Sequence, residues 1–331
     1  MKAHAGDPIP RTVDWNLLAV LRFVLAAIVV CCHLSWFSPL PVAWVEQVAS
    51  LGGKAAVIGF LLVSGFSIAA SVDRGGTWAF YRRRWWRIYP LYVVAVLATA
   101  ILQVVIGADL DLPHKELARD TWPTFVGNLF LLQTFVVKPL AFDGPIWSLA
   151  VEVFFYLLAP WLWRLKRWAL LALIVFSAGC YLLPKHEDWG AVYLVLCKLN
   201  ALKYAWCWLL GLLWFRERSL VVKVALVGGL APLMIVLGRS EPLGFVTYLV
   251  TIAVLMYADR IRMPVKLAAV ADYLGGLSYP LYLLHLPALI CAYVICGWHA
   301  PGLLAVFALL VTMVAYQLVE VWLKPRLMGR R

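Results

Sequence analysis

Ionisable side chains inside long apolar stretches are the residues of this 331-residue sequence best suited to chemistry. A charged group at the centre of a membrane-spanning helix costs roughly 2.5 kcal/mol or more on insertion scales, so such groups face a polar cavity or pair with one another. Guanidinium groups there bind phosphate oxygens, and imidazole and carboxylate groups transfer protons. The candidates are Arg22, His33, Glu152, Lys198, Lys203, His285 and Glu320.

Arg22 and His33 lie in one apolar stretch, eleven residues apart. At about 100° per residue, this spacing points both side chains in nearly the same direction, about 16 Å apart along a helix axis. The structural alternative is that Arg22 extends to the lipid headgroups and that His33 is an interfacial ring. Because other stretches also contain charged groups, we expect a shared polar cavity, with Arg22 towards the cytoplasm and His33 towards the outside.

Glu152 belongs to a polar stripe, since Ser148, Glu152 and Tyr156 recur at four-residue spacing. A carboxylate at this depth can orient or charge-balance an imidazole such as that of His33. It can equally form a structural ion pair with another helix, for example with Lys203. The residues alone leave both interpretations open.

His285 lies near the middle of a later apolar stretch, with Ser278 and Tyr282 on a similar helix face. A histidine at such a position acts in catalysis or hydrogen-bonds between helices, and the spacing does not separate the two. A cluster of arginines, Arg82, Arg83, Arg84 and Arg87, precedes a third apolar stretch. It is consistent with anionic lipid headgroups or with a phosphate site.

The composition requires lipid as the solvent for most of the chain. Hydrophobic residues make up 64% of it and the mean hydropathy is +0.87, whereas a soluble domain is nearer half apolar. The net charge of +12 is spread in short clusters between apolar runs, as the positive-inside rule expects, which argues against a nucleic-acid partner. The seven cysteines lie in apolar runs without metal-ligand spacing, so we expect no metal site.

About 20 apolar residues cross a bilayer as a helix. The sequence therefore predicts an all-α integral membrane protein with ten transmembrane helices and a single domain over residues 1–331, with short cytoplasmic tails at 1–14 and 324–331. The predicted spans are 15–36, 52–71, 85–106, 146–163, 168–183, 191–215, 220–238, 243–258, 273–297 and 301–323.

The apolar run Phe125–Val137 is short and contains Asn128 and Gln133, so it is either a span or a re-entrant segment. Treating it as re-entrant, with the N-terminus inside, places most of the 29 Lys and Arg residues in cytoplasmic loops. We therefore expect both termini in the cytoplasm. The segment Gly107–Ile146 is then outside, and its length suggests a lid or a substrate platform.

Five motifs in order resemble acyltransferase family 3. Each motif alone is weak, but the set extends from the first span to the ninth. The motifs are Arg22 with His33 ten residues between them, Val63-Ser64-Gly65-Phe66, Arg83-Arg84-Trp85-Trp86-Arg87-Ile88-Tyr89-Pro90-Leu91-Tyr92, Trp147-Ser148-Leu149-Ala150-Val151-Glu152 with Phe155-Tyr156, and Leu277-Ser278-Tyr279-Pro280-Leu281-Tyr282-Leu283-Leu284-His285. The chain departs from the family pattern at Ile58, Val153 and Pro325, which blurs the subgroup and so the acceptor.

The resemblance implies O-acylation, most often O-acetylation, of envelope or exported carbohydrates by a multi-pass protein of the bacterial inner membrane. The implied donor substrate is cytoplasmic acyl-CoA, acetyl-CoA first of all, and no bound cofactor is implied. The carbohydrate acceptor and the lipid bilayer are the other partners, with proteins of polysaccharide biosynthesis or export as further candidates.

On this hypothesis His33 is the general base and Glu152 orients it, while Arg22, Arg84 and Arg87 bind the donor phosphates. Further cavity candidates are Ser64, Trp147, Ser148, Tyr282 and His285. The alternative from another class is a transporter or flippase of a lipid-linked glycan. That alternative predicts inverted repeats and broken helices in matching halves, and neither is evident in the sequence.

The charge distribution generates a topology prediction. In a cysteine-free background, a cysteine placed beside Lys138 reacts with a membrane-impermeant maleimide in intact cells, because Gly107–Ile146 is outside. A cysteine placed beside Arg164 reacts only after the cells are opened. Labelling at Arg164 from outside contradicts the ten-span arrangement.

Overall fold

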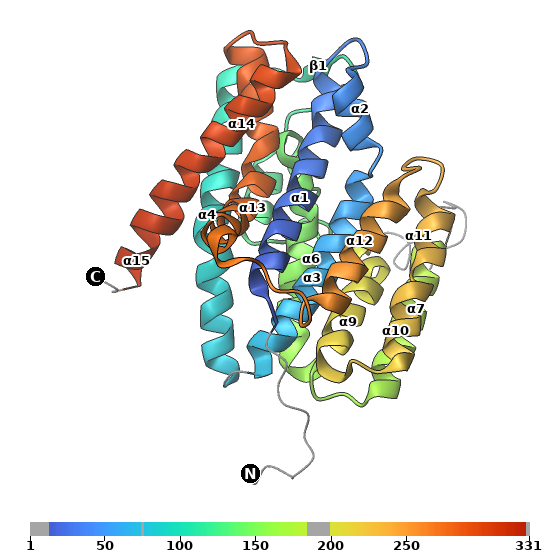
Figure 1. The fold of residues 1–331 in the computed structure, drawn as a ribbon. Helices are drawn as coiled ribbons and strands as arrows, with labels where there is room; N and C mark the ends of the chain where they lie inside the picture. The colour runs from blue at the N-terminus through green and yellow to red at the C-terminus, as the bar shows by residue number, and fades with distance from the viewer. Residues whose placement is uncertain (1–12, 74–75, 184–198, 329–331) are drawn as a thin grey trace.

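A computed structural model of the chain describes residues 13–73, 76–183 and 199–328. It is an all-α bundle with one short β-hairpin (Figure 1). The bundle helices are α1 (Trp15–Leu34), α3 (Gly53–Asp73), α4 (Thr77–Ile106), α6 (Trp147–Leu162), α7 (Arg167–Leu182), α9 (Asn200–Glu217), α10 (Leu220–Gly228), α11 (Leu230–Leu237), α12 (Gly244–Tyr257), α13 (Val265–Ile290) and α14 (Pro301–Ala315).

Shorter elements lie at the helix ends. They are η1 (Ser35–Phe37), α2 (Ala43–Ala49), β1 (Leu110–Leu112), β2 (Lys115–Leu117), α5 (Trp122–Leu129), η2 (Ala141–Ile146), the π-helical η3 (Cys291–Ile295) and η4 (Tyr316–Leu323), and α15 (Lys324–Leu327). The two strands pair antiparallel, with Asp111 opposite Glu116.

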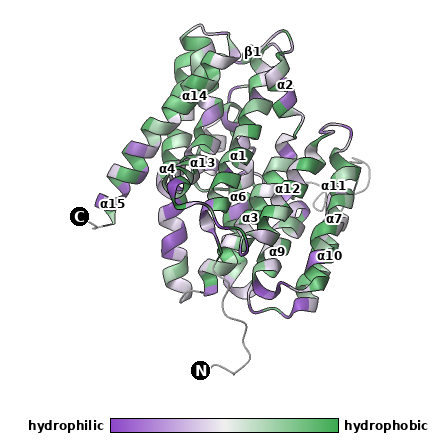
Figure 2. Ribbon diagram, viewed as in Figure 1, coloured by the Kyte–Doolittle hydropathy of each residue, from purple (hydrophilic) through white to green (hydrophobic). Residues whose placement is uncertain are grey.

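The bundle helices are hydrophobic around most of their circumference, with polar residues towards their ends (Figure 2). Such helices have lipid on one side and protein on the other. Asp14 caps the first of them: its carboxylate accepts hydrogen bonds from the backbone N–H groups of Asn16 and Leu17, which the helix leaves without a partner. Asp14 also accepts from Met263 N–H and so fixes the start of α1 against the chain before α13.

Seven helical stretches in the described residues are long and apolar enough to cross a membrane. The other three predicted spans correspond to α7, α9 and α12. Helices α7 and α12 have 16 and 14 residues, about 24 and 21 Å, and α9 contains Lys203, Arg216 and Glu217. The all-α membrane fold is thus confirmed, whereas the number ten stays a prediction.

Several predicted boundaries differ from the observed ones. Helix α4 begins at Thr77, not at residue 85, and α13 begins at Val265, not at residue 273. Hydropathy marks only the part of a helix that lies in hydrocarbon, and both helices continue beyond it. The predicted span 191–215 lies partly outside the described residues, as does Lys198.

The predicted outer segment Gly107–Ile146 forms the hairpin, α5 and η2. Helix α5 has eight residues, about 12 Å, which is too short to span a bilayer; whether the run re-enters a membrane stays a prediction. Its polar residues attach it to the bundle. Tyr92 of α4 donates to the Asn128 carbonyl oxygen at 2.6 Å, and Gln133 donates to Tyr92 and to the Ile146 carbonyl oxygen, both at 3.0 Å.

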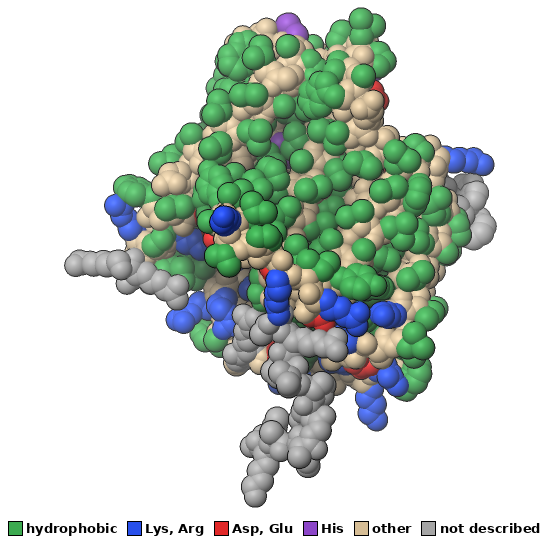
Figure 3. All heavy atoms as spheres, in the orientation of Figure 1, with side chains coloured by type: hydrophobic (Ala, Val, Ile, Leu, Met, Phe, Trp, Pro, Cys, Tyr) green, Lys and Arg blue, Asp and Glu red, His purple; other side chains and the backbone are tan. Residues whose placement is uncertain are grey.

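The surface shows where the basic residues gather. On the face in Figure 3, hydrophobic side chains cover most of the upper and middle part, and most Lys and Arg side chains lie towards the lower end. The ends of α3, α6, α9 and α12 lie at that end in Figure 1. This arrangement agrees with basic loops on one side of a membrane.

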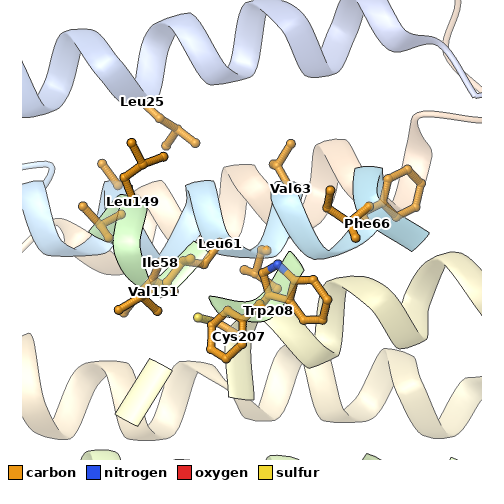
Figure 4. Packing of buried hydrophobic residues seen from close by; sticks show 14 of the residues in the cluster. Leu25, Ile58, Leu61, Val63, Phe66, Leu149, Val151, Cys207 and Trp208 are labelled. Carbon is orange, nitrogen blue, oxygen red and sulfur yellow. The ribbon is translucent and has the colours of Figure 1, made fainter. Parts of the chain in front are cut away.

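The closest helix contact in the core joins α3 to α9. Figure 4 shows Trp208 and Cys207 of α9 packed among Ile58, Leu61 and other buried residues of α3. A Cβ atom on Gly65 would overlap the Trp208 carbonyl group, and one on Gly211 would overlap the Leu62 carbonyl group. These two glycines allow the backbones to approach, as small residues do in membrane bundles.

This contact generates a stability prediction. We expect Gly65→Val and Gly211→Val each to lower the melting temperature of the detergent-solubilised protein strongly, because overpacking of a tight contact costs about 1–3 kcal/mol or more. Gly179→Val on α7 is the matched control, since nothing lies within 4 Å of its added Cβ. Equal melting temperatures for the Gly65 and Gly179 variants, measured by fluorescence-detected thermal unfolding, contradict the packing role.

Candidate active site

A cavity of about 110 Å³ with both apolar and polar lining residues lies within the bundle, between α1, α3, α4, α6 and α13. Its apolar lining includes Val57, Phe60 and Leu61. Its polar lining consists of Arg22, Ser64, Ser67, Arg84, Arg87, Ser148, Glu152, Tyr156, Ser278, Tyr279 and Tyr282. We call it the inner cavity.

Glu152 is the acidic residue of the inner-cavity lining. Its Oε1 atom accepts a hydrogen bond of 2.5 Å from Ser64 and another, shorter one from Tyr156. Ser64 comes from α3 and Tyr156 is one turn further along α6. The carboxylate is therefore held by two hydroxyl groups, which reduces the cost of its burial.

The cations of the cavity are incompletely paired. Arg22 makes no hydrogen bond or ion pair within the described residues, and its Nε atom is buried. Arg84 donates to the Ser71 hydroxyl at 3.2 Å, and its Nε atom is buried without a partner. Arg87 differs, because it lies 3.7 Å from the Glu320 carboxylate and over the Tyr279 ring.

A second cavity of about 440 Å³ adjoins the first. Trp15, Ala70, Ser71 and Arg83 line it, and Arg22, Ser67 and Arg84 line both cavities. We call it the basic vestibule. It lies at the end of the bundle where α1 begins and α3 ends, so a ligand passing from the vestibule inwards meets Arg22 and Arg84.

Away from the basic vestibule, the lining of the inner cavity includes Ser148 and Tyr282. Their hydroxyl groups are 2.7 Å apart, and Tyr282 also donates to the Pro145 carbonyl oxygen at 3.0 Å. The Phe60 ring packs edge-on against the Tyr282 ring, with centroids 5.4 Å apart. The Tyr282 ring is in turn 6.2 Å from the His285 ring.

His33 and His285 form a pair beside Tyr282. The Nδ1 atom of His33 is 3.2 Å from the Nε2 atom of His285 and 2.8 Å from the Val29 carbonyl oxygen. Trp36 packs edge-on against His33 at 4.5 Å between centroids. Neither histidine is among the described residues that line the inner cavity.

An acyltransferase domain model matches residues 16–319 of the chain. The chain belongs to acyltransferase family 3. It is 33% identical over 165 residues to the acyltransferase MdmB of Streptomyces mycarofaciens. That match covers 48% of this chain and 41% of the relative, so the chain spans well under half of the curated relative's length. No solved structure matches the chain.

The predicted site residues of this family 3 acyltransferase divide into two groups. Six predicted residues, three donor-binding arginines and three other cavity candidates, share the inner cavity with Glu152. His33 and His285 lie together outside the lining. Those in the cavity are Arg22, Ser64, Arg84, Arg87, Ser148 and Tyr282.

Two predicted relations have no contact to support them. Glu152 does not hydrogen-bond to His33, since its carboxylate accepts from Ser64 and Tyr156. Nor is it paired with a lysine in the described residues.

Trp147 does not line the cavity but packs against the Tyr204 ring of α9, with centroids 5.1 Å apart. Glu320 pairs with Lys324 as well as with Arg87, both near the end of the bundle where α15 lies.

Helix α3 has a polar stripe of which only Ser64 was predicted from the sequence, while Ser67 and Ser71 were missed. Ser64, Ser67 and Ser71 recur at three- and four-residue spacing and line the two cavities. The same periodicity that identified Ser148, Glu152 and Tyr156 would have identified them. Each is small and neutral, however, and a serine in a span attracts less attention than a charge.

The electrostatics of the cavities generate a test. We expect Ser67→Cys, in a cysteine-free background, to react faster with an anionic methanethiosulfonate than with a cationic one, because Arg22 and Arg84 attract anions to this position. Replacing Arg22 by Gln should reduce this preference, while replacing Arg82, which lines neither cavity, should not. Equal rates for the two reagents contradict a net positive cavity.

Proposed function

We propose that the chain transfers an acyl group, with acetyl the first candidate, from acyl-CoA to a hydroxyl group of an envelope or exported carbohydrate. In this proposal it lies in the bacterial cytoplasmic membrane with both termini inside. The vestibule then opens towards the acyl-CoA pool, and the end with His33 faces outwards.

One observation carries the proposal: guanidinium groups surround the cavities without enough counter-charges. Arg22 has no hydrogen-bonding partner in the described residues, and Arg84 has the Ser71 hydroxyl. Glu152 is already held by Ser64 and Tyr156. Unsatisfied guanidinium groups in a low-dielectric bundle favour a ligand with several anionic oxygens. The phosphates of coenzyme A supply these.

The arrangement also supports His33 as the general base. Its Nδ1 atom is occupied by Val29 and His285, while its Nε2 atom makes no hydrogen bond in the described residues. Nε2 accepts the proton of the acceptor hydroxyl as the oxygen attacks the thioester carbon. The C–S bond then breaks, and the coenzyme A thiolate takes the proton from the imidazolium. The products are an ester and free coenzyme A.

The acyl group must reach His33 from the inner cavity. Phe60 and Tyr282 line the cavity with their rings in contact, and the Tyr282 ring is adjacent to His285. We propose that these rings turn aside for the acyl end of the donor, while its phosphates stay with Arg22 and Arg84. Only the acyl group then changes sides of the membrane.

The transporter alternative has less support. The chain belongs to an acyltransferase family. A flippase for a lipid-linked glycan needs a continuous route for a large headgroup, whereas the inner cavity measures only about 110 Å³.

The proposal is tested by donor titration in membrane vesicles, measuring transfer of radiolabelled acetyl from acetyl-CoA to carbohydrate. We expect His33→Ala to reduce kcat to background. Arg22→Ala should raise KM for acetyl-CoA with a smaller effect on kcat, since it removes donor binding. Arg22→Lys should recover part of the loss, because a point charge does not replace a bidentate phosphate contact.

The chain offers matched controls. Arg82→Ala removes a positive charge from the start of α4, at a residue that lines neither cavity, and His299→Ala removes an exposed histidine of the segment between α13 and α14. Both should behave as wild type. Wild-type transfer by His33→Ala would overturn the base assignment, and an unchanged KM with a collapsed kcat for Arg22→Ala would remove Arg22 from the donor site.

A further inference from the structure

Two histidines from distant parts of the chain meet inside the bundle. His33 is in the last turn of α1 and His285 is in the second half of α13. Their ring centroids are 5.0 Å apart, and their nearest nitrogen atoms are 3.2 Å apart. His285 is fully buried, whereas His33 is half-buried. Both are therefore held in one geometry, and only His33 is open on one side.

The surroundings of His285 determine which of its nitrogens has the proton. Its Nδ1 atom is 3.0 Å from the Leu281 carbonyl oxygen and 2.9 Å from the Tyr282 carbonyl oxygen. Carbonyl oxygens only accept hydrogen bonds, so Nδ1 must be the donor. A neutral imidazole has one N–H group, and its Nε2 atom is therefore left with a lone pair that faces His33.

The same argument then determines the proton of His33. Its Nδ1 atom faces two acceptors, the Val29 carbonyl oxygen and the Nε2 atom of His285. Nδ1 must therefore have the proton, and Nε2 of His33 has the lone pair. In the described residues no hydrogen bond occupies that lone pair.

We propose that His285 is the positioning residue for His33. It holds the imidazole in the tautomer whose Nε2 atom is free to accept a proton, and it stabilises the protonated ring by accepting from its Nδ1–H group. This inference rests on the proposed function of His33 as a base. It assigns to His285 the part that sequence analysis gave to Glu152.

A neutral partner for His33 suits this buried position better than a charged one. A carboxylate beside His33 would bury a charge in the resting enzyme, and burying a charge has a large desolvation cost. An imidazole partner supplies a lone pair without that charge. His285 cannot pass the proton further, because its own N–H group faces backbone carbonyl oxygens, so it positions the base and does not replace it.

Two substitutions separate positioning from packing. His285→Leu fills the site but removes the acceptor, and we expect kcat for acetyl transfer to fall about 10- to 100-fold, the range measured for groups that orient metal-binding histidines, with KM for acetyl-CoA within about twofold. His285→Gln places an amide oxygen where Nε2 stood. It should recover much of kcat at equal melting temperature. Equal kcat for the Gln and Leu variants, or a loss that appears in KM, overturns the proposal.

A second measurement does not depend on activity. The chain has six histidines, and substitution of each assigns their ¹⁵N signals in nanodiscs. We expect His33 and His285 both to be Nδ1–H tautomers in the wild type, and His33 to become a tautomer mixture in His285→Leu. A proton on Nε2 of His33 in the wild type overturns the pairing whether or not the enzyme is active. Absence of acetyl transfer by the wild type overturns the proposed function instead.

Discussion

The structure depends on one constraint: a buried polar group must find its hydrogen bond or ion pair within the protein, because no water is at hand. Inside a bundle surrounded by lipid, a polar group without a protein partner costs free energy that solvent cannot recover. Glu152 meets this constraint with two hydroxyl groups, and Glu320 meets it with Arg87 and Lys324. Arg22 lines both cavities and makes no hydrogen bond or ion pair in the described residues, and both carboxylate oxygens of the buried Asp143 also lack a partner there. Arg22 differs from Asp143 in that it lines both cavities, so its guanidinium group is placed where a ligand could bind it.

Close packing of the helices brings the hydrogen-bonding partners within reach of one another. A Cβ atom on Gly275 of α13 would overlap Ala19 of α1, just as side chains at Gly65 and Gly211 would separate α3 from α9. Helix α1 therefore lies directly against α13, and His33 reaches His285 at hydrogen-bonding distance. Gly275 and Ala19 thus help to determine the distance between the two histidines, although they contact neither ring. This agrees with membrane bundles, where close backbone approach supplies much of the packing energy.

The sequence alone predicts which residues of one helix share a face. It does not predict which residues of different helices meet. The stripe Ser148, Glu152 and Tyr156 follows from helical periodicity, and Ser148 and Glu152 do share the inner cavity. The partners of Glu152 and His33 depend on how helices rotate against one another, which periodicity does not specify. Glu152 consequently pairs with Ser64 of α3, and His33 pairs with His285, 252 residues later.

The helices show the same limit: their approximate locations were predicted from the sequence, but their ends and breaks were not. Apolar length located the bundle helices, because the hydrocarbon thickness limits it. It did not show that residues 220–237 are two helices, α10 and α11, that meet at Gly228 and Gly229, nor how far α4 and α13 continue past the hydrocarbon. Those features depend on local backbone breaks and on the ends of neighbouring helices, where the hydropathy signal is weak.

Helix α1 determines the length of the candidate site. Arg22 and His33 are both on α1, so their separation of about 16 Å is determined by the rise of an α-helix and does not change when neighbouring helices move. A second helix, α13, contributes Tyr282 and His285 one turn apart, one in the lining of the inner cavity and the other beside His33. A donor that binds by its phosphates near Arg22 therefore needs a long, narrow and uncharged arm to present its reactive carbon at His33. Pantetheine has that form, whereas a compact acyl phosphate binding at the same arginines would leave its carbonyl group far from the base. If the proposed function holds, the fixed spacing on α1 selects the donor by length as well as by charge.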